Sequence, residues 1–205
     1  KLKGYKKLNE EANQDIPGYF MALEDYCKKT AVHAAYVKAY TYVKAQTDFG
    51  PRVPNTQAHR DCGEYLAQQL AEFGAKVYNQ YADLEAWDGT ILKARNIIGA
   101  YNPDSKKRIM LCAHWDSRPY ADYDADEKNH KKPIDGANDG ASGVGVLLEI
   151  ARQIQKEAPT VGIDIIFFDA EDYGTPAWHR GTYKPHDWCL GSQYWGRTPH
   201  VQGYY

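Results

Sequence analysis

The stretch VGIDIIFFDAED, residues 161–172, decides the fold that we expect for this chain. Its first eight residues form a largely apolar run of strand length, which is typical of a strand buried on both faces of a sheet. Glu171 and Asp172 follow closely, as two adjacent carboxylates at the strand's exit. On its own, such a pair usually indicates no more than a solvated loop.

Two further polar clusters occupy similar junctions upstream. The apolar run RIMLCA at residues 108–113 predicts another buried strand, and the sequence HWD, residues 114–116, leaves its end. The sequence GANDGASG at residues 136–143 places Asp139 just before a run whose apolar residues recur at helical spacing. His114 alone would be a loop histidine that caps a strand end, and Asp139 alone would be a helix N-cap.

Taken together, the three junctions favour a shared site. Strand, helix and strand in that order are typical of an open α/β sheet, in which ligands bind at the edge where the strands exit. Asp116 and Asp169 would add further acid to the Glu171–Asp172 pair at that edge. So many carboxylates would repel one another unless a cation or protons offset their charge. A bound metal ion is the economical solution, and imidazole with carboxylates favours zinc.

The expected zinc site divides its roles between neighbouring carboxylates. Catalytic zinc takes about three protein ligands and keeps one position open. Asp139 and Asp172 would provide two of the three, and the third, a histidine, has to come from elsewhere. Glu171 adjoins Asp172, so one carboxylate can bind metal while its neighbour serves as general base and acid.

The preceding sequence predicts two helices followed by a β-hairpin. Apolar residues at helical spacing indicate the helices, and a stiff loop with two prolines separates them. An Asp-Gly pair between two strand-like runs is a hairpin signal. The expected elements are a helix at 33–45, a helix that ends at Gly74, and strands at 76–82 and 91–101.

Composition bounds the class of protein. At 205 residues and 43% hydrophobic, the chain is long enough for one sizeable core. Its formal charge of −2 indicates neither nucleic acid nor an anionic membrane as a partner, and no apolar run reaches the ~20 residues of a membrane helix. The four cysteines form no Cys-x-x-Cys pair, and their spacing leaves any disulfide connectivity open. Cys112 lies within a predicted strand, so we expect a buried thiol.

The junction motifs, taken in order, resemble those of the zinc aminopeptidase and glutaminyl cyclase superfamily. The order is a strand with His-x-Asp, then Gly-Ala-Asn-Asp-Gly-Ala-Ser-Gly-Val, then Phe-Phe-Asp-x-Glu-(Glu/Asp). The likeness is closer to the glutaminyl cyclases of Bacteroidetes-type bacteria and covers roughly His33 to Tyr205. The segments that carry this closer likeness are FGPRVPNT (49–56), KARNIIG (93–99), AHWDSRP (113–119) and FDAEDYG (168–174).

This resemblance implies a zinc aminopeptidase-like fold, an α/β architecture with an open, twisted, mixed sheet flanked by helices. The glutaminyl cyclase-like domain would span residues 33–205, with residues 1–32 as an N-terminal extension of unassigned role. Family members continue past the point that corresponds to Tyr205, and their last zinc-binding histidine lies in that further part. The domain is therefore expected to be truncated, with its third zinc ligand outside the chain.

For the site, the resemblance implies a single zinc ion with Asp139 and Asp172 as ligands. Glu171 would be the catalytic acid and base, and His114 would lie nearby and support the site without binding the zinc. The implied activity is that of a glutaminyl-peptide cyclotransferase, which converts the N-terminal glutamine of a peptide to pyroglutamate and releases ammonia.

The resemblance also implies partners and a location. The substrates would be peptides or proteins with N-terminal glutamine, with no nucleic acid involved, and the protein would be exported to the periplasm or cell surface. Trp178 and Trp188, in the loop after Glu171, are candidates for a wall of the substrate pocket.

Two alternatives stay open. The first is an aminopeptidase of the same fold with two zinc ions, in which His114 is a ligand and Asp139 bridges the metals. The second is a catalytically inactive binding module that keeps the fold and has lost the metal.

Overall fold

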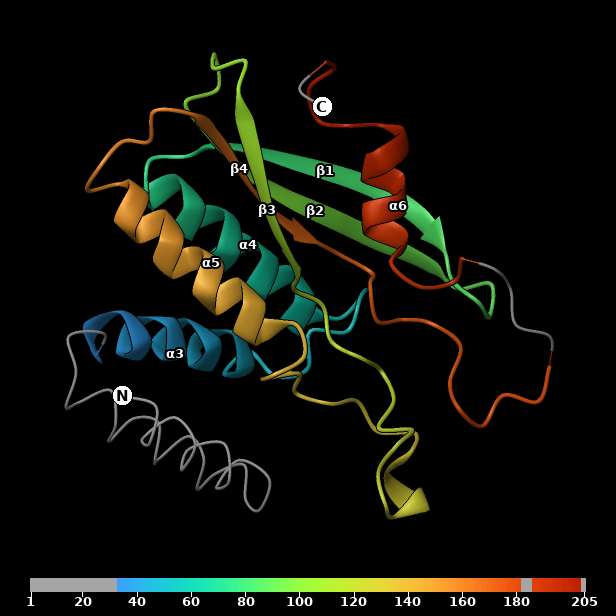
Figure 1. Ribbon diagram of the computed structural model, residues 1–205. Helices are drawn as coiled ribbons and strands as arrows, with labels where there is room; N and C mark the ends of the chain where they lie inside the picture. The colour runs from blue at the N-terminus through green and yellow to red at the C-terminus, as the bar shows by residue number, and fades with distance from the viewer. Residues whose placement is uncertain (1–32, 182–185, 204–205) are drawn as a thin grey trace, which may run out of the picture.

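A four-stranded sheet with helices on both faces forms the described part of the protein, residues 33–181 and 186–203 of a computed structural model (Figure 1). The extension predicted at residues 1–32 lies outside these residues. The elements in chain order are α3 (His33–Thr47), α4 (Gln57–Glu72), β1 (Lys76–Glu85), β2 (Ile91–Tyr101), β3 (Arg108–His114), the short 3-10 helix η1 (Glu127–Asn129), α5 (Ala141–Ile154), β4 (Gly162–Phe168) and α6 (Leu190–Arg197).

The sheet is mixed, with strand order β1-β2-β4-β3. β2 pairs antiparallel with both β1 and β4, whereas β3 and β4 run parallel. His114 at the end of β3 lies opposite Phe168 at the end of β4. The two long loops that follow these strands therefore leave the sheet from the same end (Figure 1). This confirms the open mixed α/β sheet expected from the sequence.

Local signals in the first half of the chain begin and end the elements near the predicted positions, although α3 runs on to Thr47 and β1 to Glu85. The hydroxyl of Thr56 accepts a hydrogen bond from the backbone N–H of His59 and caps α4. Gly74 follows that helix with φ +84°, a left-handed conformation that only glycine adopts without strain. Gly89 takes the same conformation in the turn that joins β1 to β2.

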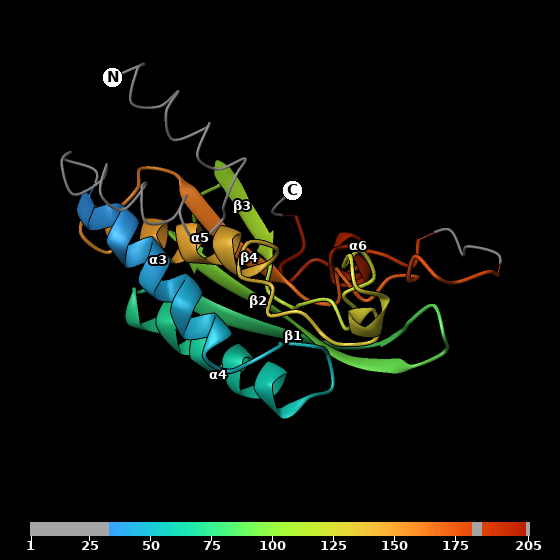
Figure 2. The same ribbon diagram turned by 90° about the horizontal axis from the view of Figure 1, so that it is seen from below.

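Successive side chains of β2 and β4 point to opposite faces of the sheet, so an apolar core forms on each face. Ile97 and Ile165 are fully buried in the larger core, together with apolar residues of α3, α4 and α5. Their neighbours Ile98 and Ile166 point to the opposite face and form a smaller core on which Trp195 of α6 packs. Figures 1 and 2 show α3, α4 and α5 grouped together and α6 apart from them.

Helix α5 approaches α3 closely at a glycine. A Cβ added to Gly145 would lie 2.8 Å from the backbone oxygen of Ala39 and 2.8 Å from Val43. The two helix backbones can meet at this distance only because residue 145 has no side chain. The contact fixes α5, whose N-terminal end follows the Asp139 motif.

The prediction of full burial for the strand at 108–113 is wrong for the described residues. Ile109 is 50% and Met110 40% exposed, and Cys112 is exposed as well. The physical reason is the strand's place in the sheet, because β3 pairs with β4 on one side and with no other described strand. The expected buried thiol at Cys112 is wrong for the same reason. Cys62, Cys112 and Cys189 are all free thiols.

Two helical glycines give a test of this packing. Gly145→Ala should lower the free energy of unfolding by about 1–3 kcal/mol, because the added methyl overpacks the contact with α3. Gly196→Ala in α6 is the matched control, since a Cβ there meets nothing within 4 Å. It should raise stability by about 0.5–1 kcal/mol through helix propensity. Urea denaturation measures both, and equal effects of the two substitutions would contradict the packing described.

Candidate active site

The ends of β3 and β4 are joined by backbone hydrogen bonds that extend past the strands. The N–H of Trp115 donates to the carbonyl of Phe168 over 3.0 Å. Beyond it, the fully buried carboxylate of Asp116 accepts the backbone N–H groups of both Glu171 and Asp172, each over 3.1 Å. One buried acid on the first loop therefore fixes the backbone of the acidic pair on the second.

Arg52, from the proline-containing loop before α4, ties together the segments around this junction. Its buried guanidinium donates to the carbonyl of Trp115 and to the carbonyls of Asp135 and Gly136, over 2.6–3.1 Å. The N–H of Ser117 donates back to the Arg52 carbonyl. The Arg52 guanidinium thus holds the two ends of the long loop 116–137 together.

His114 lies within reach of three carboxylates. Its Nε2 is 2.9 Å from Oδ1 of Asp139, and its Nδ1 is 3.5 Å from Asp116 and 3.9 Å from Glu171. Burial by itself would lower the pKa of this imidazole. The negative charges of Asp116, Glu171 and Asp139 outweigh burial and raise the pKa to about 9. The three predicted junctions therefore meet at one edge of the sheet.

Asp139 does not cap α5, so the alternative of a simple N-cap is wrong. The cap position is Gly140, which has φ +87° and makes no side-chain capping bond. A Cβ at Gly140 would lie 2.7 Å from the backbone oxygen of Asp116 and 3.2 Å from the ring of His114. The small residue lets this turn come close to the end of β3, and Asp139 contacts His114 there.

Glu171 is positioned by the chain that leads into α6. The backbone N–H groups of residues 189–191 donate in turn to the carbonyls of residues 171, 170 and 169, over 2.9–3.1 Å. The thiol of Cys189 also donates to Oε1 of Glu171 over 3.2 Å. Gly191 is required for this close approach, since a Cβ there would collide with the carbonyl of Asp169. The glutamate is 32% exposed, so it is held at its backbone and accessible at its carboxylate.

Asp172 is buried and has one oxygen without a partner. Arg118 contacts its Oδ1 over 3.4 Å, whereas Oδ2 is buried and accepts no hydrogen bond from the described residues. Burial, followed by the charges of Asp116 and Asp139, raises the pKa of Asp172 to about 7. A bound cation would satisfy the free oxygen and offset these charges.

The carboxylates of Asp139 and Asp172 are chemically suited to bind zinc, but they make up only part of a zinc ligand set. Asp139 and Asp172 lie on two different junctions and act on each other electrostatically. Over residues 33–181 and 186–203, no group of three or more His, Cys, Asp or Glu side chains is arranged to hold a metal ion. That Asp139 and Asp172 would be two of the three ligands of a zinc site therefore stays a prediction.

The expectation that Asp169 adds acid to this cluster is met only in part, because its charge acts on Asp116 while its carboxylate bonds elsewhere. Both of its carboxylate oxygens lie 2.9 Å from Nε2 of His59 on α4, and one also accepts the N–H of Arg95 over 2.6 Å. The ring of His59 stacks on Trp115, with ring centres 4.3 Å apart. Asp169 is fully buried and serves to join β4 to α4.

The two candidate tryptophans lie in different surroundings. Arg118 lies over the ring of Trp188, 4.6 Å from its centre, so Trp188 adjoins the residue that contacts Asp172. Trp178 packs edge-on against Tyr120 and stacks on His130, with ring centres 5.0 Å and 6.2 Å away. Trp188 is thus linked directly to the acidic cluster, and Trp178 to the loop after β3.

Several residues that shape the site had no role predicted from the sequence. His59, Cys189 and the buried Arg118–Asp122 ion pair fall into this group. A signal for Arg118 was available, because it stands in the AHWDSRP segment directly after the predicted His-x-Asp motif. His59 lies far from the acidic motifs in the sequence, and Cys189 lies in the loop before α6. The contacts of both residues become visible only in three dimensions.

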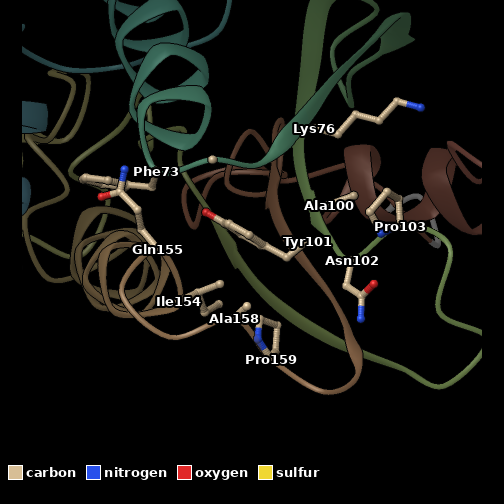
Figure 3. A pocket seen from close by; sticks show the side chains of 11 residues that line it. Phe73, Lys76, Ala100, Tyr101, Asn102, Pro103, Ile154, Gln155, Ala158 and Pro159 are labelled. Carbon is tan, nitrogen blue, oxygen red and sulfur yellow. The ribbon is translucent and has the colours of Figure 1, made fainter.

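A cavity of about 590 Å³ lies at the opposite end of the sheet. Figure 3 shows Phe73 and Gln155 on one side of it and Asn102 and Pro103 on the other, with Tyr101 between them. Of the described residues that line this cavity, Lys76 alone is charged. It therefore lacks the titratable groups that distinguish the strand-exit edge.

The sequence of the second half of the chain defines its family. Residues 96–204 match the model of peptidase family M28. They include the second half of β2, all of β3, α5, β4 and α6, and the acidic cluster. The chain belongs to peptidase family M28, as the resemblance to the zinc aminopeptidase-like superfamily led us to expect.

Three solved structures are similar to this chain. The glutaminyl cyclase of Bacteroides thetaiotaomicron is 70% identical with a TM-score of 0.81, over 82% of this chain and 57% of its own. A leucine aminopeptidase precursor from the same species has the same identity and TM-score, over 82% of this chain and 58% of its own. A Zn-dependent exopeptidase from Parabacteroides distasonis is 62% identical with a TM-score of 0.79, over 80% and 56%.

These comparisons confirm the expected fold. The chain spans a little over half the length of each of the three proteins. Among the helices of the described residues, none combines the length and the apolar character that crossing a membrane would require.

Proposed function

We propose that residues 33–205 form the part of a glutaminyl-peptide cyclotransferase that carries the catalytic acid and two zinc ligands. The reaction converts the N-terminal glutamine of a peptide or protein to pyroglutamate and releases ammonia. The 70% identity to a glutaminyl cyclase over 82% of the chain supports this activity.

The observation that carries the proposal is the contrast between two adjacent carboxylates. Asp172 is buried with a free oxygen, whereas Glu171 is accessible and held by Cys189. One acid is thus suited to bind a metal and the other to exchange protons with a substrate. Both are fixed through their backbone by Asp116, so their relative position is determined before substrate binds.

A single zinc ion held by Asp139 and Asp172 is the cofactor that we propose. When bound by these aspartates, zinc would supply Lewis acidity, which would polarise the γ-carbonyl oxygen of the substrate glutamine. His114 contacts Asp139 through Nε2 and orients that carboxylate. The similarity to a Zn-dependent exopeptidase supports the choice of metal.

The chemical step requires no external nucleophile. The α-amine nitrogen of the substrate forms a bond to its own γ-carbonyl carbon, and the bond from that carbon to the amide nitrogen breaks. Glu171 takes a proton from the attacking amine and gives it to the departing nitrogen, which leaves as ammonia. Holding amine and carbonyl in one geometry avoids much of the entropic cost of the reaction, up to several kcal/mol.

Trp188 is the substrate-facing wall that we favour, because Arg118 connects it to Asp172. Trp178 would extend that wall on the side of Tyr120. We further propose export to the periplasm or cell surface, and the similarity to an aminopeptidase described as a precursor supports this location.

Product analysis tests the activity. With zinc, the purified protein should convert a Gln-initiated peptide to its pyroglutamyl form with one ammonia per turnover, and it should leave a Leu-initiated peptide intact. Mass spectrometry and an ammonia assay measure the two products. Release of free leucine by protein with two bound zinc ions would replace the proposal with an aminopeptidase. Zinc binding without either reaction would identify an inactive binding module.

Two conservative substitutions separate the roles of the acidic pair. Glu171→Gln should reduce kcat by about 10²–10⁴, the range expected for loss of a general acid and base, while zinc stays bound. Asp172→Asn should release zinc, because a neutral amide replaces a charged ligand. Elemental analysis after dialysis measures the metal. Loss of zinc from Glu171→Gln with retention in Asp172→Asn would show that the two roles are reversed.

A further inference from the structure

Arg118 joins the two loops that surround the acidic cluster. Its Nε and one terminal nitrogen donate to the two oxygens of Asp122, over 2.7 and 2.6 Å. Asp122 also accepts the backbone N–H of Ala177, in the loop after β4, over 2.8 Å. Both side chains of the pair are nearly inaccessible, at 8% and 1% exposure. The bidentate pair therefore lies buried between loop 116–137 and the loop that follows Asp172.

The third nitrogen of the same guanidinium reaches Asp172. It donates to the backbone carbonyl of Asp172 over 3.0 Å and contacts Oδ1 over 3.4 Å. Oδ2 of that carboxylate is the buried atom without a partner. Arg118 thus occupies one side of the carboxylate and leaves the other oxygen to a cation. Hydrogen bonding of this kind orients a ligating carboxylate and sets its affinity for metal.

The guanidinium plane also supports the proposed pocket wall. It lies 4.6 Å from the centre of the Trp188 ring. Trp188 also lies close to Gly174, where a Cβ would collide with the indole. The tryptophan therefore contacts both the arginine and a residue without a side chain. The Arg118 guanidinium thus contacts both the proposed zinc ligand and the proposed wall of the substrate pocket.

A second buried ion pair in the chain lies away from the acidic cluster and serves as a comparison. Arg108 binds Asp164 with two hydrogen bonds of 2.7 and 2.6 Å, and the two side chains are 1% and 0% exposed. Arg108 also donates to the carbonyls of Tyr101, Asn102 and Ser105, at the end of the sheet away from the acidic cluster. The two pairs match in chemistry and burial, and they differ in their neighbours.

We propose that Arg118 is a positioning residue of the site, which aims Asp172 at the zinc and holds Trp188 against the substrate. This inference rests on the proposed function, because it takes Asp172 as a zinc ligand. The forked shape of the guanidinium makes this positioning role specific to arginine. Two of its nitrogens can bind Asp122 while the third is directed at Asp172.

Zinc affinity, measured by competition with a chromogenic chelator, tests the proposal without depending on turnover. The variant is Arg118→Met with Asp122→Asn, which removes both charges and leaves no unpaired buried ion. The zinc Kd should rise about 10–100-fold, and KM for a Gln-initiated peptide should rise as Trp188 loses its support. The matched control, Arg108→Met with Asp164→Asn, should keep both constants within about twofold at a comparable loss of stability.

Arg118→Lys is the second variant, in case the double substitution does not fold. Lysine keeps the charge beside Asp122 but cannot direct separate nitrogens at two carboxylates, so zinc affinity should still fall, by about tenfold. Unchanged zinc affinity in a folded Arg118 variant, or an equal loss in the Arg108 control, would overturn the proposal. Failure of the proposed function can be distinguished from failure of the Arg118 proposal. In that case wild-type protein would bind zinc without forming pyroglutamate, or Asp172→Asn would keep its zinc.

Discussion

The parallel pairing of β3 with β4 is the constraint on which the candidate site depends. Antiparallel strands would place their exits at opposite ends of the sheet, whereas this pair ends in register, with His114 opposite Phe168. The loops that follow carry the acidic motifs, and Asp116 bonds the backbone of both Glu171 and Asp172. That register brings His114 close to the acidic pair that follows β4.

The local charge balance explains why this edge suits a cation. Asp116 is buried yet satisfied by backbone N–H groups, and His114 is drawn toward its protonated form by the carboxylates around it. Asp172 has no such compensation on one oxygen, and burial with the neighbouring acids raises its pKa. A doubly charged ion at that oxygen would offset this unfavourable charge arrangement more effectively than a proton. Stability and metal binding are therefore coupled at Asp172.

The sequence predicted the features that arise from periodicity and from strand exits. The hairpin, the helix stop at Gly74 and the strand–helix–strand order were visible because local patterns determine them. The exposure of β3 was not, because a continuous apolar run does not say how many neighbours a strand has. The orientation of Asp169 toward His59 was missed because the two residues are 110 positions apart and no local pattern reports their contact. The contact of Arg118 with Asp172, 54 residues further along the chain, has no local signature.

The central claim is that Asp139 and Asp172 share one zinc ion beside a free glutamate. Anomalous diffraction at the zinc edge, from crystals of the zinc-loaded protein, tests it most directly. We expect a single peak about 2.0–2.2 Å from a carboxylate oxygen of Asp139 and from one of Asp172, with Glu171 outside the coordination shell. A peak that touches neither aspartate, or a pair of peaks bridged by Asp139, would contradict it.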